Sequence, residues 1–345
     1  MSQNVMQKSP EVVPAAAQLM PMIFGFMTSQ AIAVVSKLGI ADLLKDEPKN
    51  VEELAQATGA QPRPLYRILR ALASVGIFIE VEGGRFGLTP MAEALRSDVP
   101  ESLRGLAMFF GAEFHWRVWS DLFYSAQSGL PGFERVYGKA YFDYLAENPV
   151  PAQIFNDAMT SFSASVSAAV TDAYDFSGIK KLVDVGGGHG LFLASILQKY
   201  PQMNGVLFDA QSVIDGASEV LTAHGAGGRC ETVGGDFFRS VPEGGDAYIM
   251  KHIIHDWDDE RSFTILQNCH RAMTADGKVL VVEMVIPEGN APSLGKFLDL
   301  EMLMFLHSFE RTEAEYRALF ERAGFKLTRI VPTPSPHSVL EAVRL

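Results

Sequence analysis

Two histidines follow a short apolar segment in the run Met250–Trp257. An imidazole with an ordinary pKa of about 6.5 is neutral near physiological pH and can accept a proton. A histidine at the carboxyl end of a strand is therefore suited to general-base catalysis. His252 and His255 both compete for this role. We favour His255 because it belongs to a His-Asp-Trp turn, in which Asp256 and Trp257 are placed to shape the site.

A glycine-rich run lies at the end of an earlier predicted strand, where Gly186, Gly188 and Gly190 follow Asp184. Glycines between the first strand and the first helix of a sheet let a ligand approach the backbone closely. A dinucleotide loop needs G-x-G-x-x-G, whose last glycine would fall at position 191 or 193, and both are leucine. The G-x-G-x-G spacing, with an acid two positions before it, indicates an S-adenosylmethionine site that would release S-adenosylhomocysteine.

Two more acids lie at strand ends. Asp209 ends the predicted strand Gly205–Asp209, and Asp236 follows Cys230–Gly234. In a sheet of parallel strands the carboxyl ends share the edge where ligands bind. There Asp209 can accept both ribose hydroxyls, while Asp236 can accept the adenine amino group and Phe237 can flank the base. Each acid alone could be a helix N-cap, but acids at successive strand ends favour the cofactor.

From Ile179 onward, apolar strands alternate with helices, which predicts an α/β fold with a parallel, doubly wound sheet. Helices are expected at about 190–200, 213–223, 258–274 and 312–323. The last two strands should form an edge hairpin. The predicted strands are Lys181–Val185, Gly205–Asp209, Cys230–Gly234, Ala247–Lys251, Lys278–Met284, Phe325–Val331 and Ser338–Arg344.

Residues 37–97 predict three helices followed by a two-stranded wing. Asn50 should cap the helix Val51–Thr58, with Glu53 in the capping-box position and Gly59 at the end. A third helix begins near Pro62, and the wing strands are Ile77–Val81 and Arg85–Leu88. DNA-binding domains use this architecture. The would-be recognition helix, however, offers only Arg63, Arg67 and Arg70 in a chain of net charge −12, so we expect no nucleic-acid partner.

No charged residue occurs from Val12 to Ser36. That length could cross a bilayer, but prolines and polar residues interrupt the stretch, so we expect no membrane contact. Leu19, Met22, Ile23 and Phe26 fall at helical spacing and predict a helix buried on most of its surface. Because a terminal helix this apolar needs a covering surface, we expect a homodimer. The two cysteines, Cys230 and Cys269, form no metal or disulfide pattern, which suits the cytoplasm.

Residues 98–175 look mostly helical and are rich in aromatic residues, broken by a loop from Gly129 to Gly132. Whether these aromatic side chains are core or line a substrate pocket stays open. The aromatic residues are Phe109, Phe110, Phe114, Trp116, Trp119, Phe123 and Tyr124.

Six runs carry a resemblance to a known family: DVGGGHG, FDAQSVI, GGDFFRSVP, DAYIMKHIIHDWDDE, GKVLVVEMVIP and ERTEAEYRALFERAGF. Over essentially the whole chain they resemble the caffeic-acid and flavonoid type of small-molecule O-methyltransferase and its bacterial natural-product relatives. The resemblance implies a Rossmann-like doubly wound catalytic domain at 178–345, a helical substrate-lining region at 98–177 and an N-terminal, all-helical winged-helix dimerisation domain at 1–97.

The resemblance also implies roles for individual residues. His255 is the base, flanked by Glu283 and Glu310, and no metal is required. A carboxylate that accepts the other ring N–H fixes the tautomer and stabilises the imidazolium. Met159, Ser163 and Lys251 would join the cofactor site, and the residues implied to contact the acceptor are Phe155, Met159, Asp256 and Met302.

The acceptor is expected to be a hydroxyl of a small aromatic or polyketide-like molecule. Plant members often have threonine in place of His189, a difference expected to change little. They often have histidine where this chain has Phe162, and with the aromatic-rich middle segment this implies an acceptor other than a simple phenylpropanoid. Three alternatives stay open. One is a relative that keeps the cofactor but performs hydroxylation or decarboxylation, or that methylates by proximity alone. The second is N-, S- or C-methylation, and the third is a winged-helix DNA-binding regulator.

Overall fold

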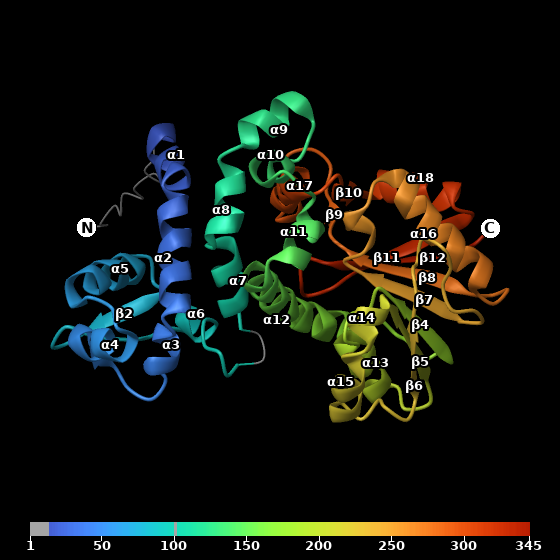
Figure 1. Ribbon diagram of the computed structural model, residues 1–345, viewed down its shortest axis with the longest axis horizontal. Coiled ribbons are helices and arrows are strands. Elements are labelled where there is room, and N and C mark those ends of the chain that lie inside the picture. Colours follow the sequence, from blue (N-terminus) through green and yellow to red (C-terminus); the bar gives the residue numbers. More distant parts are fainter. Residues whose placement is uncertain (1–13, 100–101) are drawn as a thin grey trace, which may run out of the picture. The chain divides into compact units, whose positions relative to one another are not determined.

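The computed structural model describes residues 14–99 and 102–345, and the chain divides into two compact units, the first ending at His115 and the second beginning at Trp116 (Figure 1). The first unit consists of helices around a small sheet, with a core that includes Leu54, Leu65, Leu69 and Phe86. Its elements are α1 (Ala15–Ile23), α2 (Gly25–Lys37), α3 (Ile40–Leu43), β1 (Lys49–Asn50), α4 (Val51–Thr58), α5 (Pro62–Ser74), β2 (Phe78–Val81), β3 (Arg85–Leu88), α6 (Pro90–Glu93) and α7 (Arg104–Phe110).

The predicted order of three helices and a wing is confirmed. Asn50 caps α4 through a reciprocal pair of hydrogen bonds, because its Oδ1 accepts from the Glu53 backbone N at 2.9 Å and Glu53 accepts from the Asn50 backbone N at 2.8 Å. Gly59 ends the helix with φ 72°. The expectation of an all-helical unit is wrong, since β1 pairs with β3 and extends the hairpin to three strands in the order β1-β3-β2.

The apolar N-terminal stretch forms α1 and α2. Val12 and Val13, where the uncharged run begins, lie outside the described residues. Leu19, Met22, Ile23 and Phe26 are 56%, 76%, 59% and 49% exposed in the single chain, so the expectation of a mostly buried helix is wrong for one chain alone. Within the described part of the chain, the stretch Ala15–Lys37 is the one helical region long and apolar enough to cross a bilayer, by length and composition only. An apolar face of this size needs another surface to cover it.

The second unit begins with short helices, as predicted for the middle of the chain. Glycines in the left-handed conformation end two of them, Gly129 (φ 71°) and Gly138 (φ 73°). These helices are α8 (Glu113–Trp119, which spans the boundary), α9 (Leu122–Ser128), α10 (Gly132–Tyr137), α11 (Tyr141–Glu147) and the long α12 (Pro149–Ala173).

A seven-stranded sheet in the order β11-β12-β8-β7-β4-β5-β6 forms the rest of the unit. Strands β4 to β8 are parallel, whereas β12 runs antiparallel between β8 and β11, which confirms the predicted terminal hairpin. The strands are β4 (Lys181–Val185), β5 (Asn204–Asp209), β6 (Cys230–Gly234), β7 (Ala247–Lys251), β8 (Lys278–Glu283), β11 (Phe325–Pro332) and β12 (Ser338–Arg344).

Helices cover both faces of this sheet (Figure 1). One face packs against α12, α13 (Leu191–Lys199) and α15 (Ala217–Ala223), and the other against α16 (Asp259–Ala272) and α18 (Glu313–Arg322). The doubly wound arrangement is therefore confirmed. Side chains alternate between the two cores along each strand, as in β4, where Leu182 joins one core and Val183 the other.

Two helical expectations need correction. The single helix expected at 213–223 is two, α14 (Gln211–Ile214) and α15, because Gly216 interrupts it and glycine is unfavourable inside a helix. Helix α17 (Gly295–Phe305) was not expected.

Candidate active site

His255 lies just beyond the carboxyl end of β7, in the single helical turn η1 (Ile254–Asp256). Its Nδ1 is 2.8 Å from Glu310 Oε1 and 3.6 Å from Glu283 Oε2. Its Nε2 is 3.5 Å from Asp256 Oδ1. The structure thus brings together the three residues expected to form the catalytic group, with both glutamates buried.

The sheet explains why Glu283 reaches the imidazole. Glu283 ends β8, the neighbour of β7, and its Oε1 accepts hydrogen bonds from the backbone N of Ile253 and Ile254 at 3.0 Å each and of His255 at 3.4 Å. One carboxylate oxygen therefore holds the backbone of the turn, while the other faces Nδ1.

Glu310 is positioned by a short parallel pair of strands, β9 (Val285–Ile286) and β10 (Arg311–Thr312), which it directly precedes. This pairing sets Arg311 opposite Val285, two residues after Glu283, so Glu310 enters the same site. Its backbone N donates to Asp299 Oδ1 at 2.9 Å, which ties it to α17.

The buried carboxylates control the charge on the imidazole. Burial opposes protonation of His255, but Glu283, Glu310 and Asp256 outweigh it and hold the pKa of His255 well above its usual value. Burial raises the pKa of Glu283 to about 7 and that of Asp256 to about 6. The group therefore stabilises the imidazolium that forms once neutral His255 has accepted a proton.

Arg311 fixes the backbone of the histidine turn from both sides. The fully buried guanidinium donates to the carbonyl oxygens of Ile254 at 3.0 Å and Trp257 at 2.9 Å, and pairs with Asp259 Oδ1 at 2.8 Å. Sequence analysis missed this residue, although it directly follows Glu310.

His252, the competing base, has a different environment. Its Nε2 lies 2.8 Å from His337 Nε2, and its ring stacks on Phe162 at 5.3 Å. Burial lowers the pKa of His252 well below its usual value and that of His337 to about 3, so both rings are neutral. The carboxylates contact the ring of His255 rather than His252, which supports His255 as the base. His337 was missed; β12 starts at the carboxyl edge of the sheet and brings its preceding residue there.

The glycine loop has the conformation its sequence requires. Gly186, Gly188 and Gly190 all have positive φ, at 73°, 60° and 83°. A side chain on Gly186 would meet Ile253, since a Cβ there would lie 2.4 Å from Cδ1. Asp184 is buried below the loop, its Oδ2 has no hydrogen-bond partner within the described parts of the chain, and burial raises its pKa to about 7. An unsatisfied buried carboxyl beneath an open glycine turn fits a ligand that supplies hydrogen-bond donors.

Asp209 ends β5 and Asp236 follows β6, and both carboxylates accept hydrogen bonds from nearby backbone N–H groups. Asp209 Oδ2 accepts from the Gly188 backbone N at 2.8 Å, which ties the second strand to the glycine loop. Asp236 Oδ1 accepts from the Phe238 backbone N at 2.9 Å, and its side chain is exposed. Phe237 packs edge-on to Trp257, with ring centroids 6.0 Å apart. The loop after β6 therefore packs against Trp257, the residue that follows the histidine turn.

Helix α12 contributes the remaining residues expected at the cofactor. Lys251 Nζ donates to Ser163 Oγ at 2.5 Å, which joins α12 to the end of β7. Burial lowers the pKa of Lys251 to about 8, against the attraction of Asp184 and Glu283. Met159 is half-buried and lies one helical turn before Ser163.

An aromatic cluster adjoins the acceptor residues. Tyr141 packs edge-on against Phe133, Phe155 and Phe305, with centroid distances of 5.0, 5.6 and 5.4 Å. Met302, also expected at the acceptor, is half-buried on α17, the helix that carries Phe305. Of the cluster, only Phe155 was expected at the acceptor, because the dense aromatic run that the sequence shows lies at residues 109–124.

The aromatic residues from 109 to 124 have mixed environments. Phe109 and Phe114 are buried, whereas Phe123 is 74% exposed. Trp119 donates its indole N–H to Glu301 Oε2 at 3.1 Å, which links α8 to α17. This segment is therefore neither wholly core nor wholly surface.

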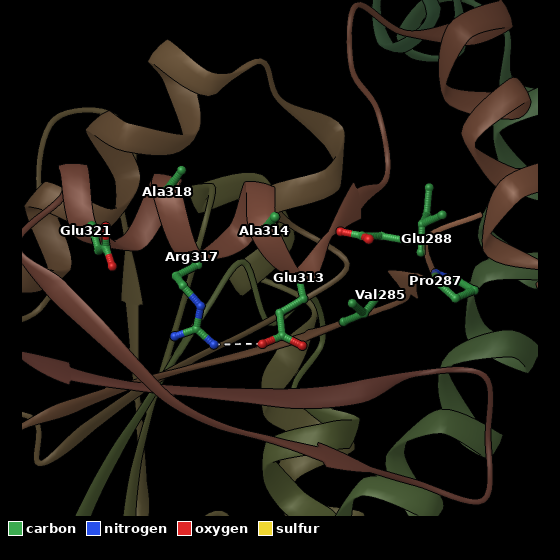
Figure 2. A pocket seen from close by; sticks show the side chains of 9 residues that line it. Val285, Pro287, Glu288, Glu313, Ala314, Arg317, Ala318 and Glu321 are labelled. Carbon is green, nitrogen blue, oxygen red and sulfur yellow. Dashed lines mark hydrogen bonds and ion pairs between the residues drawn. The ribbon is translucent and has the colours of Figure 1, made fainter.

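A surface hollow of about 610 Å³ lies between β9 and α18 (Figure 2). Its wall carries the exposed ion pair Glu313–Arg317, with Glu288 and Glu321 nearby. None of the residues expected in the active site lines it, so we assign it no part in the chemistry.

Among the described residues, His255, Glu283 and Glu310 also form a group whose donor atoms lie within 4.8 Å of one another, as metal ligands can. Hydrogen bonding accounts for the short contact, since 2.8 Å is the length of a charge-assisted N–H···O bond.

Family models match most of the chain. One described as an O-methyltransferase domain matches residues 119–326, and one described as an O-methyltransferase dimerisation domain matches residues 20–98. The phenazine O-methyltransferase PhzM of Lysobacter antibioticus is 48% identical over 330 residues, covering 96% of each chain. Phenazine-1-carboxylate N-methyltransferase of Pseudomonas aeruginosa is 33% identical over 330 residues, covering 96% of this chain and 98% of the relative. The crystal structure of LaPhzM superposes with a TM-score of 0.90 at 47% identity, covering 96% of this chain and 100% of that chain.

Proposed function

Because this chain belongs to the O-methyltransferase family, we propose that it transfers a methyl group to a hydroxyl of a small, planar aromatic natural product. The chain is a methyltransferase, and its cofactor is S-adenosylmethionine. The choice of oxygen as the acceptor atom and of His255 as the base belongs to the proposal.

The contact between His255 and the two buried glutamates carries this proposal. A phenolic hydroxyl is a poor nucleophile until it loses its proton, so its methylation benefits from a base in the site. An amine already has a lone pair and needs such a base less. His255 has two buried carboxylates at Nδ1, while its Nε2 lies on the side of Asp256. This arrangement favours oxygen as the methyl acceptor.

In the proposed mechanism, His255 Nε2 takes the proton from the acceptor hydroxyl. Glu310 accepts the N–H on Nδ1, which keeps the ring in the tautomer with a free Nε2, and Glu283 stabilises the imidazolium that forms. When bound, S-adenosylmethionine would supply an electrophilic methyl group, and the methyl–sulfur bond that breaks would leave S-adenosylhomocysteine. Holding the two substrates in line contributes a large part of the acceleration.

The cofactor would be held along the carboxyl edge of the sheet. Asp184 offers its unsatisfied oxygen, and the loop from Gly186 to Gly190 offers close approach to backbone. The other residues that we assign to this site are Asp209, Asp236, Phe237, Lys251, Met159 and Ser163. On the acceptor side we assign Phe155, Met159, Asp256 and Met302.

The aromatic cluster on α10, α11, α12 and α17 supports a flat aromatic acceptor, because aromatic side chains form favourable contacts with further planar rings. The relative at 48% identity is described as acting on a phenazine, so we propose a hydroxylated phenazine-like tricycle. N-methylation is the second candidate, because a relative at 33% identity is described as an N-methyltransferase.

We further propose that the chain works in the cytoplasm as a homodimer, without nucleic acid or membrane. The dimerisation-domain match and the exposed apolar side chains of α1 and α2 support the dimer. Light scattering after size exclusion should give twice the chain mass of 37.7 kDa.

The function is tested with a matched pair of acceptors, 1-hydroxyphenazine and 1-aminophenazine. We expect the purified protein and S-adenosylmethionine to add 14 mass units to the hydroxyl compound, with the new methyl on oxygen by NMR. Exclusive methylation of nitrogen would favour the second candidate, and a gain of 16 mass units would indicate hydroxylation.

A further inference from the structure

The hydroxyl of Tyr141 is buried and unsatisfied. Tyr141 lies at the start of α11, is 5% exposed, and its Oη has no hydrogen-bond partner among the described residues. Buried phenolic hydroxyls nearly always have one, because leaving such a group unpaired costs free energy. A partner is therefore missing from the protein itself.

The ring around this hydroxyl is held in place. Phe133, Phe155 and Phe305 contact it edge-on, at interplanar angles of 80°, 87° and 82°. A tyrosine Oη lies on the ring axis, so a fixed ring also fixes the position of its oxygen. The hydroxyl cannot turn away to another partner without disturbing three packed aromatic side chains.

The surroundings of the hydroxyl are acidic. Burial raises the pKa of Tyr141, and the carboxylates of Glu301 and Asp256 raise it further, so the phenol keeps its proton. Asp256 Oδ1 is also 3.5 Å from His255 Nε2, so one carboxylate acts electrostatically on the Tyr141 hydroxyl and contacts the imidazole. A protonated phenol near two carboxylates can donate to a neutral atom, whereas an anionic group would be repelled.

We propose that Tyr141 determines acceptor specificity by donating a hydrogen bond to a neutral acceptor atom, a ring nitrogen or carbonyl oxygen, on the molecule whose hydroxyl faces His255. This inference rests on the proposed function and adds a second recognition point to it. Aromatic phenols with such an atom are the preferred substrates, and their hydrocarbon analogues or carboxylated forms are poor ones.

Two acceptors of the same outline test the inference. 1-Hydroxyphenazine carries two ring nitrogens, and 1-hydroxyanthracene has C–H groups in their place. The wild-type protein, Tyr141→Phe and Tyr144→Phe are compared for kcat and KM with each acceptor. Tyr144 lies on the same helix, so Tyr144→Phe is the same chemical change nearby. Tyr141→Phe keeps the packed ring, and donor affinity measured by calorimetry confirms an intact cofactor site.

The wild-type protein should prefer 1-hydroxyphenazine. Tyr141→Phe should raise KM for this acceptor about 3–10-fold, as expected for one lost hydrogen bond, and leave KM for 1-hydroxyanthracene and kcat for both nearly unchanged. Tyr144→Phe should keep the wild-type preference. If the wild-type protein methylates both acceptors and Tyr141→Phe changes KM equally for both, or for neither, this inference is wrong while the proposed function stands. No transfer to either acceptor by the wild-type protein overturns the proposed acceptor class, and this inference with it.

Discussion

His255 Nδ1 lies 2.8 Å from Glu310 Oε1, in a site where that carboxylate is buried. A carboxylate oxygen at this distance accepts the N–H of Nδ1, so in the neutral imidazole the proton is on Nδ1 and Nε2 keeps its lone pair. The contact thus selects the tautomer that can act as a base on the side of Asp256.

Replacing the base should stop chemistry without preventing donor binding. His255→Gln is expected to lower kcat about 10²–10⁴-fold, because the hydroxyl loses its proton acceptor. The affinity for S-adenosylmethionine, measured by calorimetry, should stay within about threefold, since one hydrogen bond at most is affected. His224→Gln, at an exposed histidine after α15, serves as the matched control. Full activity of the His255 variant would rule out the assignment of the base.

The pH profile should reveal the raised pKa of His255. A base works only when neutral, so kcat/KM should rise with pH and reach its plateau above the range of an ordinary histidine. Glu310→Gln removes one of the charges that favour the imidazolium, which moves the acid limb to lower pH. The plateau rate should fall about 10²-fold, because the tautomer and the imidazolium are no longer supported. An unmoved acid limb in this variant would show that the limb belongs to another group.

The sheet was predictable because its central strands are apolar runs bounded by glycine or polar residues. Strands β4, β6, β7 and β12 begin and end at the predicted residues. Helix α17 was not predicted from the sequence. Its acidic and apolar residues are interspersed, and it begins after Leu294 without a capping side chain that would mark its start.

The site was predictable where parallel strands end, and less so elsewhere. His255 followed from its strand, but Glu283 and Glu310 were implied by family resemblance. The approach of Glu310 depends on a two-residue pairing of β9 with β10, which leaves no periodic pattern. His337 directly precedes the antiparallel strand β12, so only tertiary packing brings it to the site.

Asp184 should matter for the donor and not for the acceptor. Asp184→Asn keeps the shape but removes the charge beneath the glycine loop, where one oxygen is unsatisfied. We expect the Kd for S-adenosylmethionine to rise about tenfold, a loss of about 1.4 kcal/mol, with little change in the acceptor's KM at saturating donor. Glu231→Gln, an exposed carboxylate on β6, is the control. Unchanged donor affinity would remove Asp184 from the cofactor site.

Chelation should leave the activity intact. His255, Glu283 and Glu310 are close enough to ligate a cation, yet the short contact among them is a hydrogen bond in the proposed mechanism. We expect EDTA dialysis to change kcat by less than about twofold, and added Mg²⁺ or Zn²⁺ to give no stimulation. Loss of activity that a divalent ion restores would instead assign these residues to a metal site.

Arg311 should act on catalysis through position alone. Its guanidinium holds the carbonyl oxygens of Ile254 and Trp257, on either side of His255, without a hydrogen bond to the ring. Arg311→Met removes the guanidinium's hydrogen bonds to both carbonyls and its ion pair with Asp259, so the free energy of unfolding should fall by about 1–3 kcal/mol. Because the turn that carries His255 loosens, we expect kcat to fall much more than the acceptor's KM rises. Arg311→Lys keeps the charge but cannot reach both carbonyls with a planar fork, so it should restore stability more than kcat. Thermal unfolding measures the effect on stability, and steady-state kinetics measures the effect on kcat. If Arg311→Lys restored stability and kcat equally, the positive charge of Arg311 rather than its planar geometry would be what matters.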